Sequence, residues 1–222
     1  MHVLALDTAL AACSAAVFDT KRGLVAGTSL SMRRGHAEAL LPLIERVMDD
    51  AGFAFSDLDR IAVTVGPGSF TGLRVGVSAA RGIALAAGKP AVGVTTLAAF
   101  AAPALILAQG TPVLAVIDAR NDQVYLQLFR DGEADLPRIA TVSEALELAS
   151  NEPVYIAGSG GRLLVAAWPQ DRPVPSTGDA GDAPDIEWVA RLGAQASPGD
   201  LPKPLYLRAP DARPQAPQLP QR

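Results

Sequence analysis

Cysteine and histidine are scarce in this sequence. Cys13 is the only cysteine, and His2 and His36 are the only histidines among the 222 residues. A single cysteine excludes an intrachain disulfide, so a reducing cytoplasm is the expected compartment. A helical zinc pair needs histidines at positions i and i+4, and Leu40 stands four residues after His36. We therefore expect no metal site.

Long apolar runs and an excess of positive charge are absent as well. No apolar run reaches about 18 residues without a Gly, a Pro or a charge, so no membrane span is expected. The apolar stretch at residues 1–19 lacks a basic start and contains Asp7, which favours a pair of strands over a signal peptide. The chain has 19 Lys and Arg against 23 Asp and Glu, and its net charge is −4. Nucleic-acid binding by this chain alone is therefore not expected.

The chain is organised around residues 61–95. An apolar run at 61–65 predicts a buried strand, which breaks at Gly66-Pro67-Gly68. A helical stretch follows over about 71–87, and a second apolar run occupies 91–94. This unit favours a parallel or mixed sheet with a helix packed on it. The loop precedes a helix N-terminus, where unpaired N–H groups and the helix dipole commonly hold phosphates.

The loop nevertheless fits no standard nucleotide motif. A Walker loop requires G-x-x-x-x-G-K-[ST], but the span from Gly66 to Gly72 is one residue too long and Leu73 replaces the lysine. In a dinucleotide fingerprint Thr71 would stand where the third glycine belongs. Two interpretations stay open at this point: the loop contacts an anion, or it is a tight turn that lets the helix pack closely on the sheet.

A ridge of small residues recurs every four positions along the helix at 71–87. Its members are Gly72, Gly76, Ala80, Ala84 and Gly88. Such a ridge lets another backbone approach closely, and close packing would offset the cost of about 1 kcal/mol for each glycine inside a helix. In a soluble protein such a ridge usually lies on the protein's own sheet, and a partner helix is the alternative that stays open at this point.

The helix expected at 37–51 is amphipathic and ends at Gly52. Its apolar face consists of Leu40, Ile44, Val47 and Ala51, and Leu41 and Met48 widen it. We expect this face to join the ridge in one apolar surface.

An internal repeat relates the two halves of the chain. A shift of 111 positions places Val3–Asp7 on Leu114–Asp118, and in each copy an alternating strand follows. Each copy is thus a buried strand that ends in an aspartate, a turn and a second strand. In the first copy a third strand at 25–31 completes an antiparallel meander.

This duplication predicts two related subdomains, at residues 1–108 and 109–208. The proline-rich tail at 209–222 is expected to be disordered. Asp7 ends the first strand, where it could hold a metal or a phosphate-bound water, or simply stabilise the turn.

Three stretches carry a recognisable pattern: Leu4-Ala-Leu-Asp-Thr8, Gly66-Pro-Gly-Ser-Phe-Thr-Gly-Leu-Arg-Val-Gly76 and Leu205-Tyr-Leu-Arg208. Together with His36-Ala-Glu38 and Leu40-Leu41-Pro42 they resemble the TsaB (YeaZ) family, which acts in synthesis of threonylcarbamoyladenosine on tRNA. The resemblance covers almost the whole chain, through about residue 210. It implies an α/β fold of the actin/hexokinase-like (ASKHA) type, with two duplicated subdomains of mixed sheets flanked by helices.

The resemblance also implies a function. The family picture is a non-catalytic subunit that pairs with TsaD and recruits the ATPase TsaE, for modification of tRNA position 37. The catalytic relative TsaD carries two metal-binding histidines four residues apart; His36 matches the first, and Leu40 stands at the second. No catalytic residue is therefore expected here. The chain needs no cofactor of its own, and contact with ATP or ADP is left open for the complex. Contact with tRNA is expected only through the complex.

The two helices at 37–51 and 71–87 are the expected partner surface. Its residues are Leu40, Leu41, Ile44, Val47, Met48, Gly72, Gly76, Ala80 and Ala84. Without the partner the same apolar surface is expected to form a homodimer.

Two alternatives remain at the level of sequence. In one, the chain is an ATP-hydrolysing or peptidase-like enzyme that acts alone. In the other, it binds a nucleotide without turnover. The enzyme would use Asp7, the loop at 66–72 and Asp118, and nucleotide binding without turnover would use residues 69–74. The candidate nucleotide-binding residues of the two alternatives are Asp7, Gly66, Gly68, Ser69, Thr71, Gly72, Arg74 and Asp118.

Overall fold

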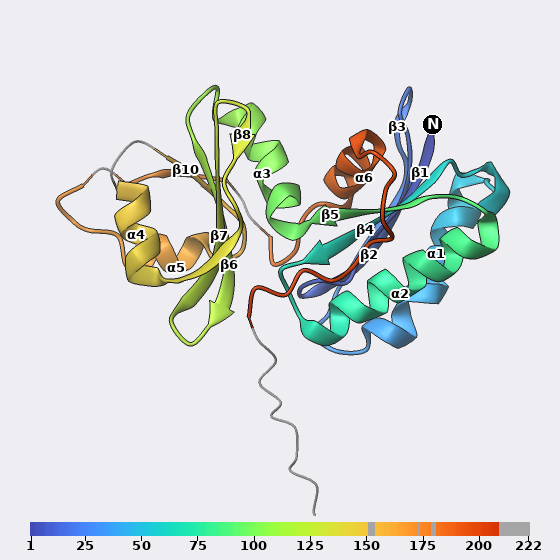
Figure 1. Cartoon of the computed structure of the whole chain (residues 1–222), viewed down its shortest axis with the longest axis horizontal. Helices are drawn as coiled ribbons and strands as arrows, with labels where there is room; N and C mark the ends of the chain where they lie inside the picture. The colour runs from blue at the N-terminus through green and yellow to red at the C-terminus, as the bar shows by residue number, and fades with distance from the viewer. Residues whose placement is uncertain (151–153, 173, 179–180, 209–222) are drawn as a thin grey trace, which may run out of the picture.

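Two α/β subdomains lie side by side in the computed structural model (Figure 1). The structure describes residues 1–150, 154–172, 174–178 and 181–208, so the tail predicted at 209–222 lies outside the described residues. Within those ranges no helix is both long enough and apolar enough to cross a membrane.

The first subdomain is built on a five-stranded sheet in the order β3-β2-β1-β4-β5. Its strands are β1 (His2–Asp7), β2 (Ala12–Asp19), β3 (Gly23–Ser31), β4 (Arg60–Gly66) and β5 (Ala91–Thr95). The first three strands form the predicted antiparallel meander, with Leu6 opposite Ala15. Strand β4 lies parallel to β1, and β5 lies parallel to β4, as the organising unit predicts.

The second sheet repeats this plan, in the order β11-β10-β6-β7-β8, with β9 also paired to β7. Its strands are β6 (Val113–Arg120), β7 (Gln123–Arg130), β8 (Glu133–Ala134), β9 (Arg138–Thr141), β10 (Tyr155–Ala157) and β11 (Ser176–Thr177). Strands β6 and β7 form an antiparallel hairpin, and β10 lies parallel to β6 as β4 does to β1. The equivalent order confirms the predicted duplication.

Helices α1 (His36–Ala51) and α2 (Phe70–Ala87) cover one face of the first sheet, and their apolar residues enter one core with those of β1, β2 and β4 (Figure 1). Both helices lie within one residue of their predicted bounds. Helix α1 ends as predicted at Gly52, whose φ of 71° is left-handed. A short 3-10 turn, η1 (Phe55–Asp57), links α1 to β4.

Two helices do not follow the expected division of the chain at 108/109. Helix α3 (Thr96–Leu107) packs on the second sheet, where Phe100 and Ala104 meet Val113 and Ile117 of β6. Helix α6 (Ile186–Gln195) returns to the first sheet, where Val189 joins the core formed by β1 and β4. The prediction that residues 109–208 form one subdomain is therefore wrong for α6.

Helices α4 (Val142–Ser150) and α5 (Gly161–Ala166) belong to the core on the other face of the second sheet. After α6, residues 200–208 form an extended segment that we name the strap. The Leu205 N–H donates to the Val65 carbonyl over 2.7 Å, and Arg208 bonds the Gln123 side chain of β7 over 2.5 Å. The strap thus contacts both sheets.

Candidate functional site

The loop between β4 and α2 is bound to the turn that follows β1. The Ser69 N–H donates to the Ala9 carbonyl over 2.7 Å, and the Thr8 hydroxyl donates to the Gly72 carbonyl over 2.7 Å. Ser69 also caps α2, because its hydroxyl accepts the Gly72 N–H. The loop is therefore held by the chain's own backbone, which favours the tight-turn interpretation.

The glycines of the loop and of α2 make this contact possible. A Cβ atom would lie 2.4 Å from the Ala9 carbonyl oxygen if placed at Gly68, and 2.0 Å from the Thr8 carbonyl oxygen if placed at Gly72. At Gly76 it would lie 2.5 Å from the Thr8 hydroxyl oxygen. These distances are too short for any real side chain, so the three glycines admit the turn after β1.

The prediction that this ridge forms an exposed surface for a partner helix is therefore wrong. Gly72 and Gly76 meet the Thr8 turn, and Ala80 and Ala84 lie in the core with β1 and β4, with exposed fractions of 0% and 3%. As expected, the glycines of α2 are closely packed, which offsets their cost inside a helix, but the neighbour is the protein's own sheet and the turn after β1.

Asp7 is fully buried beside this loop. Its Oδ1 accepts the Thr64 hydroxyl over 2.5 Å and the Ala9 N–H over 3.0 Å, while its Oδ2 has no hydrogen-bond partner among the described residues. Burial raises the pKa of the Asp7 carboxyl, and the bonds from Thr64 and Ala9 and the nearby His36 only partly oppose this. Asp7 thus holds the turn, the simpler of the two roles predicted for it.

Only some of the other residues predicted for a nucleotide site lie near Asp7. Asp118 is exposed and accepts the Arg120 N–H in the β6–β7 turn. Thr71 is exposed, and the Arg74 guanidinium lies 3.9 Å from the centre of the Phe70 ring and bonds the Tyr206 hydroxyl of the strap. The structure brings together Asp7, Gly66, Gly68, Ser69 and Gly72, and among the described residues no hydrogen bond or ion pair links Asp118 or Arg74 to them.

His36, at the start of α1, bonds the Leu10 carbonyl through Nε2 over 3.1 Å. Leu40, one turn later, is 1% exposed and packs in the core. Over the part of the chain that the structure describes, no three His, Cys, Asp or Glu side chains are grouped so that they could hold a metal ion.

The apolar face predicted on α1 also packs internally. Leu40, Ile44, Val47 and Met48 are all under 4% exposed, so the prediction that they form a free partner surface is wrong. Leu41 is different: it is 60% exposed and points away from the core it was expected to widen.

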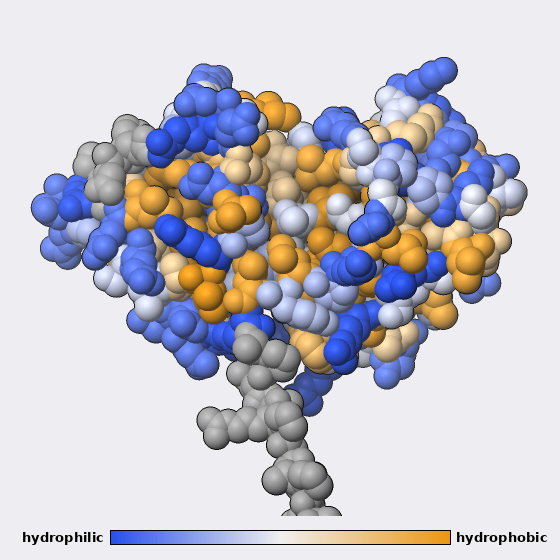
Figure 2. Space-filling model, in the orientation of Figure 1, coloured by the Kyte–Doolittle hydropathy of each residue, from blue (hydrophilic) through white to orange (hydrophobic). Residues whose placement is uncertain are grey.

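The outward sides of α1 and α2 carry a different set of residues, which we name the outer surface. It consists of Leu41, Ser78, Gly82 and Leu85, all exposed. Leu85 is 85% exposed, and a Cβ atom at Gly82 would meet nothing within 4 Å. Figure 2 shows hydrophobic residues among charged ones over these helices. The spacing of positions 78, 82 and 85 was the sequence signal that could have revealed the part of the outer surface that lies on α2.

Comparison with known proteins gives concordant matches. Residues 28–162 match the family model "TsaD: tRNA N6-adenosine threonylcarbamoyltransferase". The Haemophilus influenzae protein named "tRNA threonylcarbamoyladenosine biosynthesis protein TsaB" is 32% identical over 72% of this chain and 72% of its own length. The Escherichia coli protein of that name is 40% identical, but the match spans 56% of this chain and about half (53%) of the relative.

Solved structures agree. YeaZ from Pseudomonas aeruginosa has a TM-score of 0.78 and 31% identity, over 93% of this chain and 99% of that chain. The ROK hexokinase from Thermus thermophilus has a TM-score of 0.50 and 16% identity, so the likeness concerns the fold alone. These matches confirm the predicted actin/hexokinase-like fold.

Proposed function

The chain belongs to the TsaB (YeaZ) family, and from this premise we propose that it is a non-catalytic partner subunit in the synthesis of N6-threonylcarbamoyladenosine (t6A) at position 37 of tRNA. In this role it pairs with TsaD and recruits TsaE. The names of the Haemophilus and Escherichia relatives place those proteins in t6A biosynthesis.

The observation that carries the non-catalytic role is the closed loop before α2. The Thr8–Ala9 backbone occupies the space that side chains at Gly68 and Gly72 would need. The Ala9 carbonyl also accepts a hydrogen bond from the Ser69 N–H at the start of α2. A helix N-terminus binds an anion through N–H groups that have no partner within the protein. In this chain the Ser69 N–H is already bonded to the Ala9 carbonyl, so it is not available to an anion. The buried Leu40, at the position of the second metal-binding histidine of TsaD, supports the same role.

The outer surface of α1 and α2 supports partner binding. Leu41 and Leu85 are largely exposed, and the missing side chain at Gly82 lets another helix approach α2 closely. We propose that TsaD docks here, and that two copies of the chain pair through the same surface when TsaD is absent. The interface therefore uses the predicted helices, but their outward residues in place of their buried ones.

Cofactor and tRNA contacts follow from this role. The chain itself requires no cofactor, and ATP or ADP acts in the assembled complex. With a net charge of −4, the chain reaches tRNA through its partners.

The experiment that tests the function is an omission series with purified TsaD, TsaE, this chain, the threonylcarbamoyl donor, ATP and unmodified tRNA. We expect t6A, measured by mass spectrometry of the digested tRNA, to form in the full mixture and to fall to background without this chain. The chain alone should give no t6A. Turnover by the chain alone, or full t6A formation without it, would overturn the proposal.

A further inference from the structure

Strand β3 leaves a long open edge on the first sheet. It spans the nine residues Gly23–Ser31 and, among the described residues, pairs only with β2, so its other side carries backbone groups without a strand partner there. The opposite end of the sheet is treated differently: the strap bonds β4 at Val65, and its Pro202 lies 3.5 Å from the Cβ position of Gly93 in β5. The edge strands of the second sheet are shorter: β8 and β11 have two residues each and β9 has four.

The β3 edge lacks most of the features that usually protect such strands; the exception is an irregularity in its pairing with β2, where Val17 lies opposite Ala26 and Phe18 opposite Leu24. Proteins commonly guard an exposed edge with Lys, Pro, an inward charge or a short strand. Between Gly23 and Ser31 there is no charge and no proline, and Leu24 and Leu30 are 44% and 41% exposed. An edge with these properties is a site for the addition of another strand.

Positive charge lies at both ends of this edge. Lys21 and Arg22 precede the strand and Arg33 and Arg34 follow it, and residues 20–34 contain no acidic residue. All four side chains are exposed, and within the described residues none forms an ion pair. Two pairs of cations without an acidic residue between them are a marked local excess in a chain of net charge −4.

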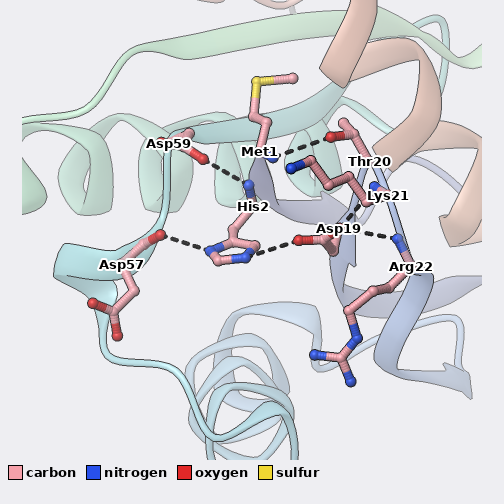
Figure 3. A network of polar contacts seen from close by, with 8 residues as sticks. All are labelled: Met1, His2, Asp19, Thr20, Lys21, Arg22, Asp57 and Asp59. Atoms are coloured by element: carbon pink, nitrogen blue, oxygen red, sulfur yellow. Dashed lines mark hydrogen bonds and ion pairs between the residues drawn. The ribbon is translucent and has the colours of Figure 1, made fainter.

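The acidic residue nearest in sequence to Lys21 is Asp19, and both of its carboxylate oxygens already have partners within the protein (Figure 3). Its Oδ2 lies 2.9 Å from Nε2 of His2, and its Oδ1 accepts the N–H groups of Lys21 and Arg22. The Arg22 side chain points away from this network in Figure 3. His2 in turn bonds the Asp57 carbonyl and stacks on Phe53, so the start of the edge is held in place.

We propose that the β3 edge binds an extended segment of another protein, with an uncharged β-forming centre and acidic residues at both ends. Backbone hydrogen bonds to β3 supply the affinity, and the flanking cations pair with the acidic ends. Between the cation pairs lie the nine residues of β3, about 30 Å long, and Met32, which sets the spacing of the acidic ends. This inference does not rest on the proposed function, because it uses neither helix of the outer surface.

Charge argues against the two other occupants. Antiparallel pairing with a second copy would bring Lys21 and Arg22 of one chain against Arg33 and Arg34 of the other, and like charges repel. RNA would need a continuous cationic track, whereas these cations form two separate pairs with an uncharged strand between them.

The test uses the purified full chain and fluorescent synthetic peptides with blocked ends, measured by anisotropy. The probe has an alternating Val–Thr centre of about nine residues with two acidic residues at each end, and the control has lysines in their place. We expect roughly tenfold or more tighter binding of the acidic probe. Replacing Lys21, Arg22, Arg33 and Arg34 together by Glu should reverse this preference, while Arg162→Glu, an exposed change on α5, should leave it unaltered.

Backbone methylation separates strand addition from simple charge attraction. Successive N–H groups of a strand point in opposite directions, so N-methylation at one alternate set of centre residues should abolish binding and methylation at the other set should preserve it. The proposal is overturned if both methylated probes bind equally or if the acidic probe fails to bind. It is equally overturned if the cations instead bind RNA, or if the chain with Leu85→Glu, which disrupts the outer surface, still forms a dimer in sedimentation that N-methylated or acidic probes do not dissociate.

Discussion

At the scale of single residues, two glycines of α2 have opposite surroundings. A Cβ atom at Gly82 meets nothing within 4 Å, whereas at Gly76 it would lie 2.5 Å from the Thr8 hydroxyl oxygen. We expect Gly82→Ala to raise the free energy of unfolding by about 0.5–1 kcal/mol, because alanine favours the helix. Gly76→Ala should lower it, because Thr8 is bonded to Gly72 and cannot move freely. Urea unfolding of both variants checks this, and a stabilised Gly76→Ala would contradict the tight packing.

Two carboxyl groups should affect stability with opposite dependence on pH. The pKa of Asp7 is raised by burial, so its contribution is greatest below pH 3.8 and is lost as the pH rises through its folded-state pKa. The pKa of Asp19 is lowered, first by the Lys21 N–H bond, so its contribution is present above pH 3.8 and is lost as the pH falls through its folded-state pKa.

The measurement is the free energy of unfolding as a function of pH for Asp7→Asn, Asp19→Asn and the unaltered chain. Relative to the unaltered chain, Asp7→Asn should gain stability as the pH rises, by at most about 1.4 kcal/mol per pH unit. The loss of stability caused by Asp19→Asn should be smallest at acid pH, where the Asp19 carboxylate of the unaltered chain is protonated as well. Parallel curves for all three proteins would show that neither group titrates differently on folding.

At the scale of elements, Arg60 fastens α6 to the first sheet. Its Nη1 donates to the carbonyls of Gly193 and Ala194 over 2.8 and 3.0 Å, and to that of Ala196, at the C-terminal end of the helix. A cation at a helix C-terminus that satisfies free carbonyls stabilises both the helix and its docking.

We expect Arg60→Met to lower the free energy of unfolding by about 1.5–3 kcal/mol, the range for hydrogen bonds to a charged group. Arg81→Met, an exposed change on α2, is the matched control and should shift it by less than about 0.5 kcal/mol. Equal effects of the two substitutions in thermal or urea unfolding would show that Arg60 is not a fastening residue.

At the scale of the whole molecule, the duplicated sheets followed from local pattern, and the placement of helices did not. Alternation and the aspartates at positions 7 and 118 predicted two hairpins, because strand periodicity and turn chemistry are local properties. The sequences of α3 and α6 do not indicate which sheet each helix covers. Helix α3 was assigned to the first subdomain and packs on the second sheet, and α6 was assigned to the second subdomain and packs on the first sheet.

The predicted partner surface shows that the sequence does not identify the neighbour of a helix either. A small-residue ridge on α2 predicts close packing correctly, but it looks the same whether the neighbour is internal or external. The internal neighbour, the Thr8–Ala9 turn, comes from more than sixty residues earlier in the chain. Only the fold shows that Leu41 and Leu85 face outward.

The central claim is that this chain acts through its outer surface and not through its loop. The direct measurement is t6A formation in the complete system with two variants, Leu85→Glu on the outer surface and Asp7→Asn at the loop. Leu136→Glu is the matched control for Leu85→Glu, because Leu136 is 87% exposed, close to the 85% of Leu85, but lies on the second subdomain. We predict that Leu85→Glu abolishes t6A formation and co-elution with TsaD, whereas Asp7→Asn and Leu136→Glu retain both. Loss of t6A in Asp7→Asn with the TsaD complex intact, together with full activity of Leu85→Glu, would contradict the account.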